Sequence, residues 1–218
     1  MKEDKLVTSY FEARSWVDEN RRLVGYAVGV PVLLLVGLFL WTLNLKESNE
    51  NATAKLSKVI PYYDQGKYEE AINGAPQEGL IQGLTAIVNE HGNTESGQLA
   101  KLYLGNCYFA KSEYQKALEQ YLDADLEDKM LAASALSGAA ACHEAMNHHE
   151  DAAVLFEKAA SKNMTGLQAP ENLHHAAVNY GLAGKKERAS ELLRKLKKEF
   201  PESALARDID RYLTQYGA

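Results

Sequence analysis

The stretch GNCYFAKSEYQKALEQYLDA, residues 105–124, spaces small and aromatic residues as two short helices joined by a tight turn would need them. The small and aromatic positions of this frame are Gly105, Tyr108, Ala117, Tyr121 and Ala124. Two antiparallel helices approach closely only where the contact residues are small, and an aromatic ring fills the space beside the crossing. The stretch therefore predicts a helical hairpin.

The same frame recurs about 35 residues downstream and again about 37 residues further on. The second copy contains Ala140, His143, Ala152, Phe156 and Ala159, and the third contains Ala177, Tyr180, Ala189, Leu193, Leu196 and Pro201. A degenerate copy lies upstream at Tyr62, Gly66, Tyr68 and Ala71, separated from the next by roughly a dozen extra residues. A repeat of this length with these positions matches the tetratricopeptide (TPR) pattern.

The sequence thus predicts an all-α fold in which residues 46–218 form a TPR-like α-solenoid of about four helical hairpins. Gly66, Ser112 and Gly184 are expected at the tight turns within the hairpins. After Pro201, apolar residues at helical spacing over residues 203–216 predict one capping helix that closes the last hydrophobic face.

Residues 23–45, LVGYAVGVPVLLLVGLFLWTLNL, contain no charged side chain. As a helix they would extend about 34 Å, enough to cross a bilayer. Arg21 and Arg22 bracket the start of this segment, and Trp41 stands near its end, where aromatic rings favour the headgroup region. The apolar run is too long for a signal peptide. We expect a single transmembrane helix preceded by a short amphipathic tail at residues 1–22.

Orientation is predicted from the basic residues that flank the segment. Those before it are Lys2, Lys5, Arg14, Arg21 and Arg22, and those within a comparable distance after it are Lys46, Lys55 and Lys58. The excess before the segment favours a cytoplasmic N-terminus. The repeat domain would then lie across the inner membrane, in the periplasm.

Composition excludes several classes of function. The formal net charge of -6 argues against a nucleic-acid partner, which needs a basic surface. The sequence shows no glycine-rich phosphate loop, nucleophile elbow or convergent acid pair, so we expect no enzyme, no cofactor and no small-molecule substrate.

Cys107 and Cys142 occupy equivalent repeat positions and are expected to be buried free thiols. The histidine pairs 148–149 and 174–175 show no ligand partner at suitable spacing, so no metal site is predicted.

The first helices of the repeats are expected to line a surface that binds other proteins. Counting along the frame gives the candidates Leu99, Leu102, Asn106 and Phe109, then Ser134, Ser137, Ala141 and Glu144, then Glu171, His174, Val178 and Gly181. Phe109 is a candidate anchor, or else packs against a neighbouring helix, and Asn106 is a candidate hydrogen-bonding group. Residues 113–128 are acidic and residues 185–198 basic. Either run can be a solvated helix face, and the basic one can instead face anionic lipid or an acidic partner.

With its tail, single anchor and degenerate repeats, the chain resembles the bacterial YfgM-like tetratricopeptide family of periplasmic subunits ancillary to the secretory translocon. The resemblance is carried by residues 23–45, by the insert GLIQGLTAIVNEHGNTESGQLAKLYLGNCYFA at 79–110, and by KKEFPES at 197–203. It implies a chaperone-like adaptor for exported or envelope proteins, with translocon subunits as partners and no catalytic residues. The insert leaves the shape of the first helical pair open, and a fixed structural subunit of a larger membrane complex is the alternative role.

Overall fold

The computed structural model describes residues 3–75 and 81–216, and its long elements are all helices. This confirms the predicted all-α class. The chain divides into two compact units, Met1–Glu47 and Ser48–Ala218.

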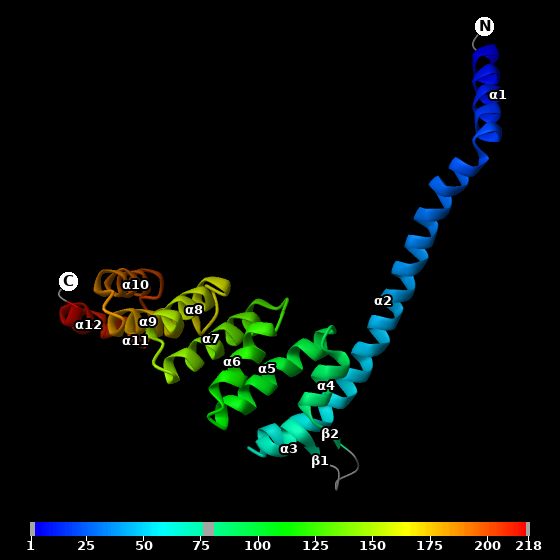
Figure 1. Cartoon of the computed structure of the whole chain (residues 1–218). Coiled ribbons are helices and arrows are strands. Elements are labelled where there is room, and N and C mark those ends of the chain that lie inside the picture. Colours follow the sequence, from blue (N-terminus) through cyan, green and yellow to red (C-terminus); the bar gives the residue numbers. More distant parts are fainter. Residues whose placement is uncertain (1–2, 76–80, 217–218) are drawn as a thin grey trace. The chain divides into compact units, whose positions relative to one another are not determined.

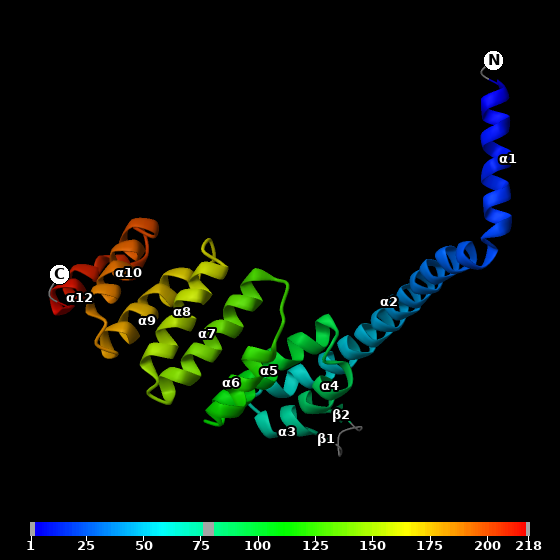
Figure 2. The ribbon, with the colours of Figure 1, turned by 45° about the horizontal axis from the view of Figure 1, so that its top comes forward.

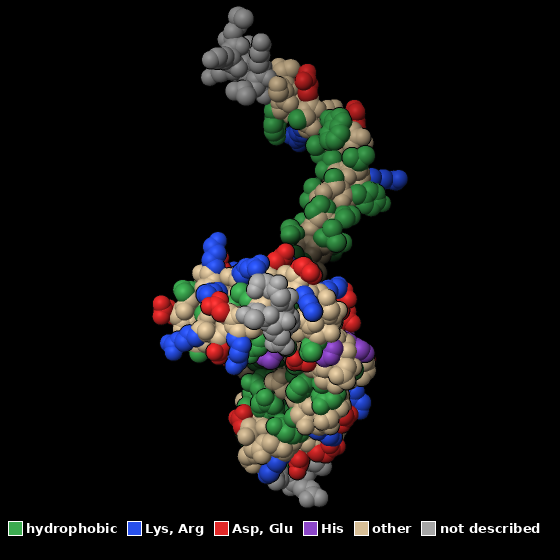
Figure 3. All heavy atoms as spheres, turned by 90° about the vertical axis from the view of Figure 1, so that its left-hand side faces the viewer, with side chains coloured by type: hydrophobic (Ala, Val, Ile, Leu, Met, Phe, Trp, Pro, Cys, Tyr) green, Lys and Arg blue, Asp and Glu red, His purple; other side chains and the backbone are tan. Residues whose placement is uncertain are grey.

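The first unit consists of α1 (Glu3–Glu19) and the start of α2 (Arg21–Asp64). Its apolar side chains, among them Leu33, Leu34 and Phe39, are exposed. Figure 3 shows hydrophobic side chains along this part of the chain. Among the described helices, α2 is the one long and apolar enough to cross a membrane. Exposed apolar side chains on every side of a helix are what a lipid environment requires.

The helix that contains the predicted membrane segment does not end at Leu45. It continues as α2 to Asp64, and its final turns bury Ala52, Leu56, Val59 and Tyr62. These residues lie in the second unit and form the first helix of its first hairpin. Residues 46–64 contain no glycine, and their one proline, Pro61, is followed within a few residues by the end of the helix, so the sequence gives no early break.

The second unit is a series of helical hairpins, as predicted. The end of α2 pairs with α3 (Tyr68–Asn73), α5 (Glu95–Ala110) with α6 (Tyr114–Asp123), α7 (Lys129–Ala145) with α8 (His149–Lys162), and α9 (Ala169–Leu182) with α10 (Lys186–Glu199). Figures 1 and 2 show α5 to α10 following one another side by side. Each helix packs mainly on its neighbours in the chain, which is the arrangement of a solenoid.

The insert between the first two hairpins has a structure that the sequence did not predict. After α3 comes a two-stranded antiparallel sheet, β1 (Gly74–Ala75) with β2 (Ile81–Gln82), and then α4 (Leu84–His91). The equivalent turn residues Gly66 and Ser112 are 46 positions apart, whereas Ser112 and Asn147 are 35 positions apart. The insert thus adds 11 residues to the repeat, which agrees with the expected dozen.

Four hairpin turns share one backbone geometry. A residue with positive φ stands in each: Gly66 (72°), Ser112 (62°), Asn147 (60°) and Gly184 (79°). The next residue in each turn donates its backbone N–H to a carbonyl five positions earlier, at Tyr62, Tyr108, His143 and Tyr180, over 2.8–2.9 Å. The turns at Gly66, Ser112 and Gly184 were predicted. Asn147 was missed, although asparagine tolerates this conformation better than most residues.

The core runs between the hairpins in three clusters. Ala117, Ala152 and Ala189, in the second helix of hairpins two to four, are fully buried, as a close helix crossing requires. The ring of Tyr121 lies between Gly105 of α5 and Gly138 of α7, where a Cβ atom at either glycine would come within 2.8 Å of the ring. Glycine therefore makes room for the ring that separates these helices.

The predicted C-terminal helical cap over residues 203–216 is present, and it consists of two short helices where a single helix was expected. α11 (Ala204–Arg207) and α12 (Ile209–Tyr216) are separated at Asp208. The break lets Ala206 and Ile209 both enter the C-terminal cluster, beside Leu193 and Leu196 of α10. The cap still covers the last hydrophobic face of the array.

Candidate protein-binding surface

The candidate residues of the predicted binding surface lie on α5, α7 and α9. We call this set the first-helix surface: Leu99, Leu102, Asn106, Phe109, Ser134, Ser137, Ala141, Glu144, Glu171, His174, Val178 and Gly181. Most are half-buried, Glu171 is exposed, and Leu102 is buried in the core. Leu102 therefore has little side-chain surface left for a partner.

Polar side chains on α7 and α9 bridge the two helices at three levels. Ser134 Oγ donates to Gln168 Oε1 (3.2 Å), and Ser137 Oγ donates to Asn172 Oδ1 (2.8 Å). Further along, the Asn179 amide donates to Glu144 Oε1 (2.8 Å). These bonds join residues 34 or 35 positions apart, one repeat length, so they fix the stacking of hairpin four on hairpin three.

Asn179, which donates to Glu144, is fully buried. Its amide nitrogen also donates to the carbonyl of His175 (3.0 Å), and its Oδ1 lies 3.0 Å from Nδ1 of His149. A buried amide is stable only when its hydrogen bonds are satisfied, as they are here. Sequence reasoning missed Asn179 because it treated the frame position before Tyr180 as an ordinary helix residue.

On α5 the polar and aromatic candidates already have partners within the chain. Asn106 donates to the Tyr63 hydroxyl (3.3 Å) and accepts from the Tyr121 hydroxyl (2.8 Å). Phe109 lies with its ring 5.4 Å from that of Tyr114 and is half-buried. Asn106 thus helps to orient hairpin two, while Phe109 keeps part of its ring exposed.

On α9, His174 is half-buried with its ring 5.0 Å from that of Tyr212. Burial, with a smaller contribution from the neighbouring His175, lowers the pKa of His174. Its Nε2 is buried without a hydrogen-bond partner among the described residues. The imidazole is therefore held in its neutral form against the cap.

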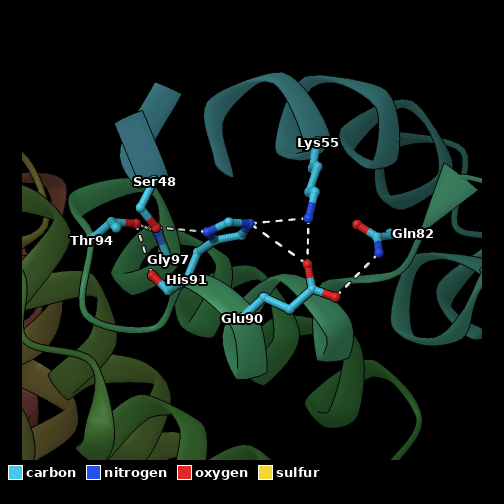
Figure 4. Close-up of polar contacts among 7 residues, drawn as sticks. All are labelled: Ser48, Lys55, Gln82, Glu90, His91, Thr94 and Gly97. Carbon is cyan, nitrogen blue, oxygen red and sulfur yellow. Dashed lines mark hydrogen bonds and ion pairs between the residues drawn. The ribbon is translucent and has the colours of Figure 1, made fainter. Parts of the chain in front are cut away.

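A second polar cluster joins the end of α2 to α4 and was not predicted (Figure 4). Lys55 Nζ donates to His91 Nε2 (3.0 Å), so the proton of that imidazole is on Nδ1, which donates to Ser48 Oγ (2.8 Å). Lys55 also forms an ion pair with Glu90, and this hydrogen bond lowers the pKa of Glu90. The cluster holds the insert against α2.

Cys107 and Cys142 are fully buried free thiols, which confirms the sequence prediction. Burial raises the pKa of each thiol to about 12. A thiol that stays protonated is a poor nucleophile and a poor metal ligand.

One group among the described residues brings three metal-binding side chains together. His143, His148 and Asp151 each offer a ligand atom, and these atoms lie within 4.8 Å of one another. This set was not predicted from the adjacent histidines in the sequence, because its members are brought together by the turn between α7 and α8.

Three of the seven basic residues at positions 185–198 form ion pairs with other described residues. Lys185 forms an ion pair with Glu150, Arg188 with Glu157 and Glu191, and Lys197 with Asp210 (2.7 Å). These ion pairs agree with the interpretation of this run as a solvated helix face.

Comparison with known protein families gives one match. A model described as tetratricopeptide repeat matches residues 171–203, the segment that holds α9 and α10. No curated protein matches the chain. The chain therefore contains a TPR repeat, a module that typically binds other proteins and is not catalytic. The match extends to the repeat and not to the YfgM-like family, which remains a prediction.

Proposed function

We propose that this chain is a membrane-tethered adaptor that holds segments of other proteins on its first-helix surface. In this proposal the repeat domain works in the periplasm as a chaperone-like ancillary factor of protein translocation or envelope assembly. Residues 1–22 are the cytoplasmic tail, residues 23–45 cross the inner membrane, and residues 46–218 bind the partners. Translocon subunits, exported clients or envelope subunits are the proposed partners.

The observation that carries the proposal is the TPR array itself, with the first helices of successive hairpins joined side by side. The α7–α9 bridges at Ser134, Ser137 and Glu144 keep these helices in register over several turns. Such a surface can receive an extended or helical segment, with apolar groups as anchors and polar groups as hydrogen-bonding partners. Phe109, Glu171 and Val178 retain exposed surface for these roles.

The distribution of exposed hydrophobic residues supports a chaperone-like role over that of a fixed subunit. Among the described residues of the repeat domain, the well-exposed large hydrophobic side chains are Leu122, Met130, Val154, Leu167 and Leu182. They come from α6, α7, α8, α9 and one loop, and Figure 3 shows acidic and basic side chains distributed over much of the visible face. A permanent subunit interface buries a large, continuous apolar area, whereas releasable clients need less.

The tether adds to this binding by mass action. A domain anchored in the membrane meets partners in the same membrane at a high effective concentration, so weak contacts suffice. The exposed apolar side chains of the first unit and the basic residues before residue 23 support the anchor and the proposed orientation.

Orientation is tested with one introduced cysteine at the exposed position Lys158, in a chain in which Cys107 and Cys142 are replaced by alanine. A membrane-impermeant maleimide should label this cysteine in spheroplasts without lysis. Labelling that requires lysis would place the repeat domain in the cytoplasm and contradict the proposal.

Partner class is tested by crosslinking and mass spectrometry of the full-length chain purified in mild detergent from its own membranes. The proposal expects translocon subunits together with many exported proteins at low stoichiometry, crosslinked within residues 99–182. A single stoichiometric complex without translocon subunits would instead establish the fixed structural role.

A further inference from the structure

The turn between α7 and α8 places two imidazoles and a carboxylate around one point. His143 is in the last turn of α7, His148 immediately precedes α8, and Asp151 is in the first turn of α8. Their nearest ligand atoms lie within 4.8 Å of one another. These residues are five and three positions apart, a spacing that a single straight helix would not bring to one point.

Comparison of the turns shows that the fold brings these three positions together. In the first turn, the ammonium of Lys67 lies 5.6 Å from the ring centre of Tyr62, at the positions equivalent to His148 and His143. In the second, the ammonium of Lys116 lies 5.4 Å from the ring centre of Tyr108, at the positions equivalent to Asp151 and His143. In the third turn the equivalent positions carry His143, His148 and Asp151. Metal-binding side chains thus stand where the first two turns have a tyrosine and a lysine.

The three side chains have no other role in the described structure. None of them forms a side-chain hydrogen bond or ion pair with another described residue, although the rings of His143 and His148 lie 5.7 Å apart. Nδ1 of His143 is buried and has no hydrogen-bond partner within residues 3–75 and 81–216. An unpaired buried nitrogen costs free energy, and a bound ion or its hydrogen-bonded ligands would remove that cost.

We propose that His143, His148 and Asp151 bind one divalent transition-metal ion of the zinc type. Two imidazoles and one carboxylate suit such an ion, and three protein ligands leave a fourth position for water. Tetrahedral coordination at zinc distances separates neighbouring ligand atoms by roughly 3.3 Å. Closing from 4.8 Å requires only side-chain rotation, because His148 and Asp151 are exposed.

The backbone of the turn is already fixed for this role. His148 N–H donates to the His143 carbonyl (2.8 Å), and Asn147 N–H donates to the Glu144 carbonyl (2.9 Å). The ligands therefore start from a rigid frame, which lowers the entropic cost of binding. The ion would join the end of α7 to the start of α8.

The test is a Zn²⁺ titration of the metal-stripped, full-length chain in detergent, by calorimetry and by competition with a chromophoric chelator. We expect one ion per chain at micromolar affinity, and visible absorption bands of a low-symmetry site when Co²⁺ replaces Zn²⁺. His148→Gln and Asp151→Asn should each weaken binding at least tenfold. His149→Gln and Glu150→Gln, which remove the neighbouring imidazole and carboxylate, are matched controls and should leave binding unchanged.

His143 is half-buried, so its variant needs a residue known to fit the turn. His143→Tyr restores the tyrosine of the other three turns and should fold while losing the ion. The proposal is overturned if the wild-type chain binds no Zn²⁺ at 100 μM, or if its binding survives His148→Gln and Asp151→Asn. His175 lies near Glu144 and is the alternative imidazole ligand. The proposal is also overturned if replacing His175 abolishes Zn²⁺ binding and replacing His148 does not.

Discussion

Gly138 offers a test of how the hairpins pack, because alanine at this helical position should be destabilising. A Cβ atom there would lie 2.5 Å from Cζ of Tyr121, and its three nearest contacts are all atoms of that ring. The ring cannot withdraw, since Gly105 lies on its other side and its hydroxyl donates to Asn106 (2.8 Å). Gly138→Ala therefore forces α7 away from α6.

Two opposing terms set the magnitude. Alanine in place of glycine within a helix stabilises it by about 1 kcal/mol. Overpacking a close contact in a core costs about 1–3 kcal/mol, and this contact is closer than a relaxed structure tolerates. For a contact this close the upper part of that range applies, about 2–3 kcal/mol. The net result is then a loss of about 1–2 kcal/mol, which for a domain of this size lowers Tm by about 2–8 °C.

The assay is thermal unfolding of the full-length chain in detergent, followed by circular dichroism. Gly138→Ala should lower Tm, and in the background of Tyr121→Leu, where the ring is absent, the same substitution should be neutral or stabilising. Gly37→Ala, in the apolar segment with nothing within 4 Å of the added atom, is the control. A rise in Tm for Gly138→Ala in the wild-type background would refute the packing argument.

Three further predictions concern the core and its polar contacts. Phe156→Ala removes a buried ring from the C-terminal cluster and should cost about 3–5 kcal/mol, read from the urea midpoint. Asn179→Ala leaves Glu144 without its buried donor and should cost about 1–3 kcal/mol in the same assay; an unchanged midpoint would argue against the α7–α9 bridge. Because burial raises the pKa of the Cys107 and Cys142 thiols from 9.0 to about 12, the unfolded chain loses their protons first, so stability should fall as pH rises above about 9. Replacing both cysteines by alanine should flatten this dependence of Tm on pH; an equal slope would contradict it.

The repeat frame could be predicted because it rests on local chemistry. Small residues such as Ala117 and Ala152 at helix crossings, and Gly66 and Gly184 at turns that need positive φ, leave a direct signal in the sequence. The helical spacing of apolar residues at 203–216 also predicted a helical C-terminal cap. It could not show that the helix breaks at Asp208, because the break depends on how Ile209 fits the core built by α10.

The contacts between repeats were less accessible to sequence reasoning. Asn179, His91 and Lys55 look like ordinary helix residues until their partners on other helices are known. The metal-binding set at His143 escaped notice for a related reason, since the turn and not a helix face brings Asp151 to it. Sequence spacing predicts what lies on one helix, and contacts across a turn or between hairpins require the fold.

The most direct test of the proposed function is site-specific photo-crosslinking of the full-length chain in its own membranes. A photoreactive amino acid is placed at Ser134 or Glu171 on the first-helix surface, or at Lys158 or Glu187 on the exposed side of the second helices. The account predicts protein adducts from Ser134 and Glu171 and few from Lys158 and Glu187. Adducts that form equally at all four positions, or only at Lys158 and Glu187, would contradict it.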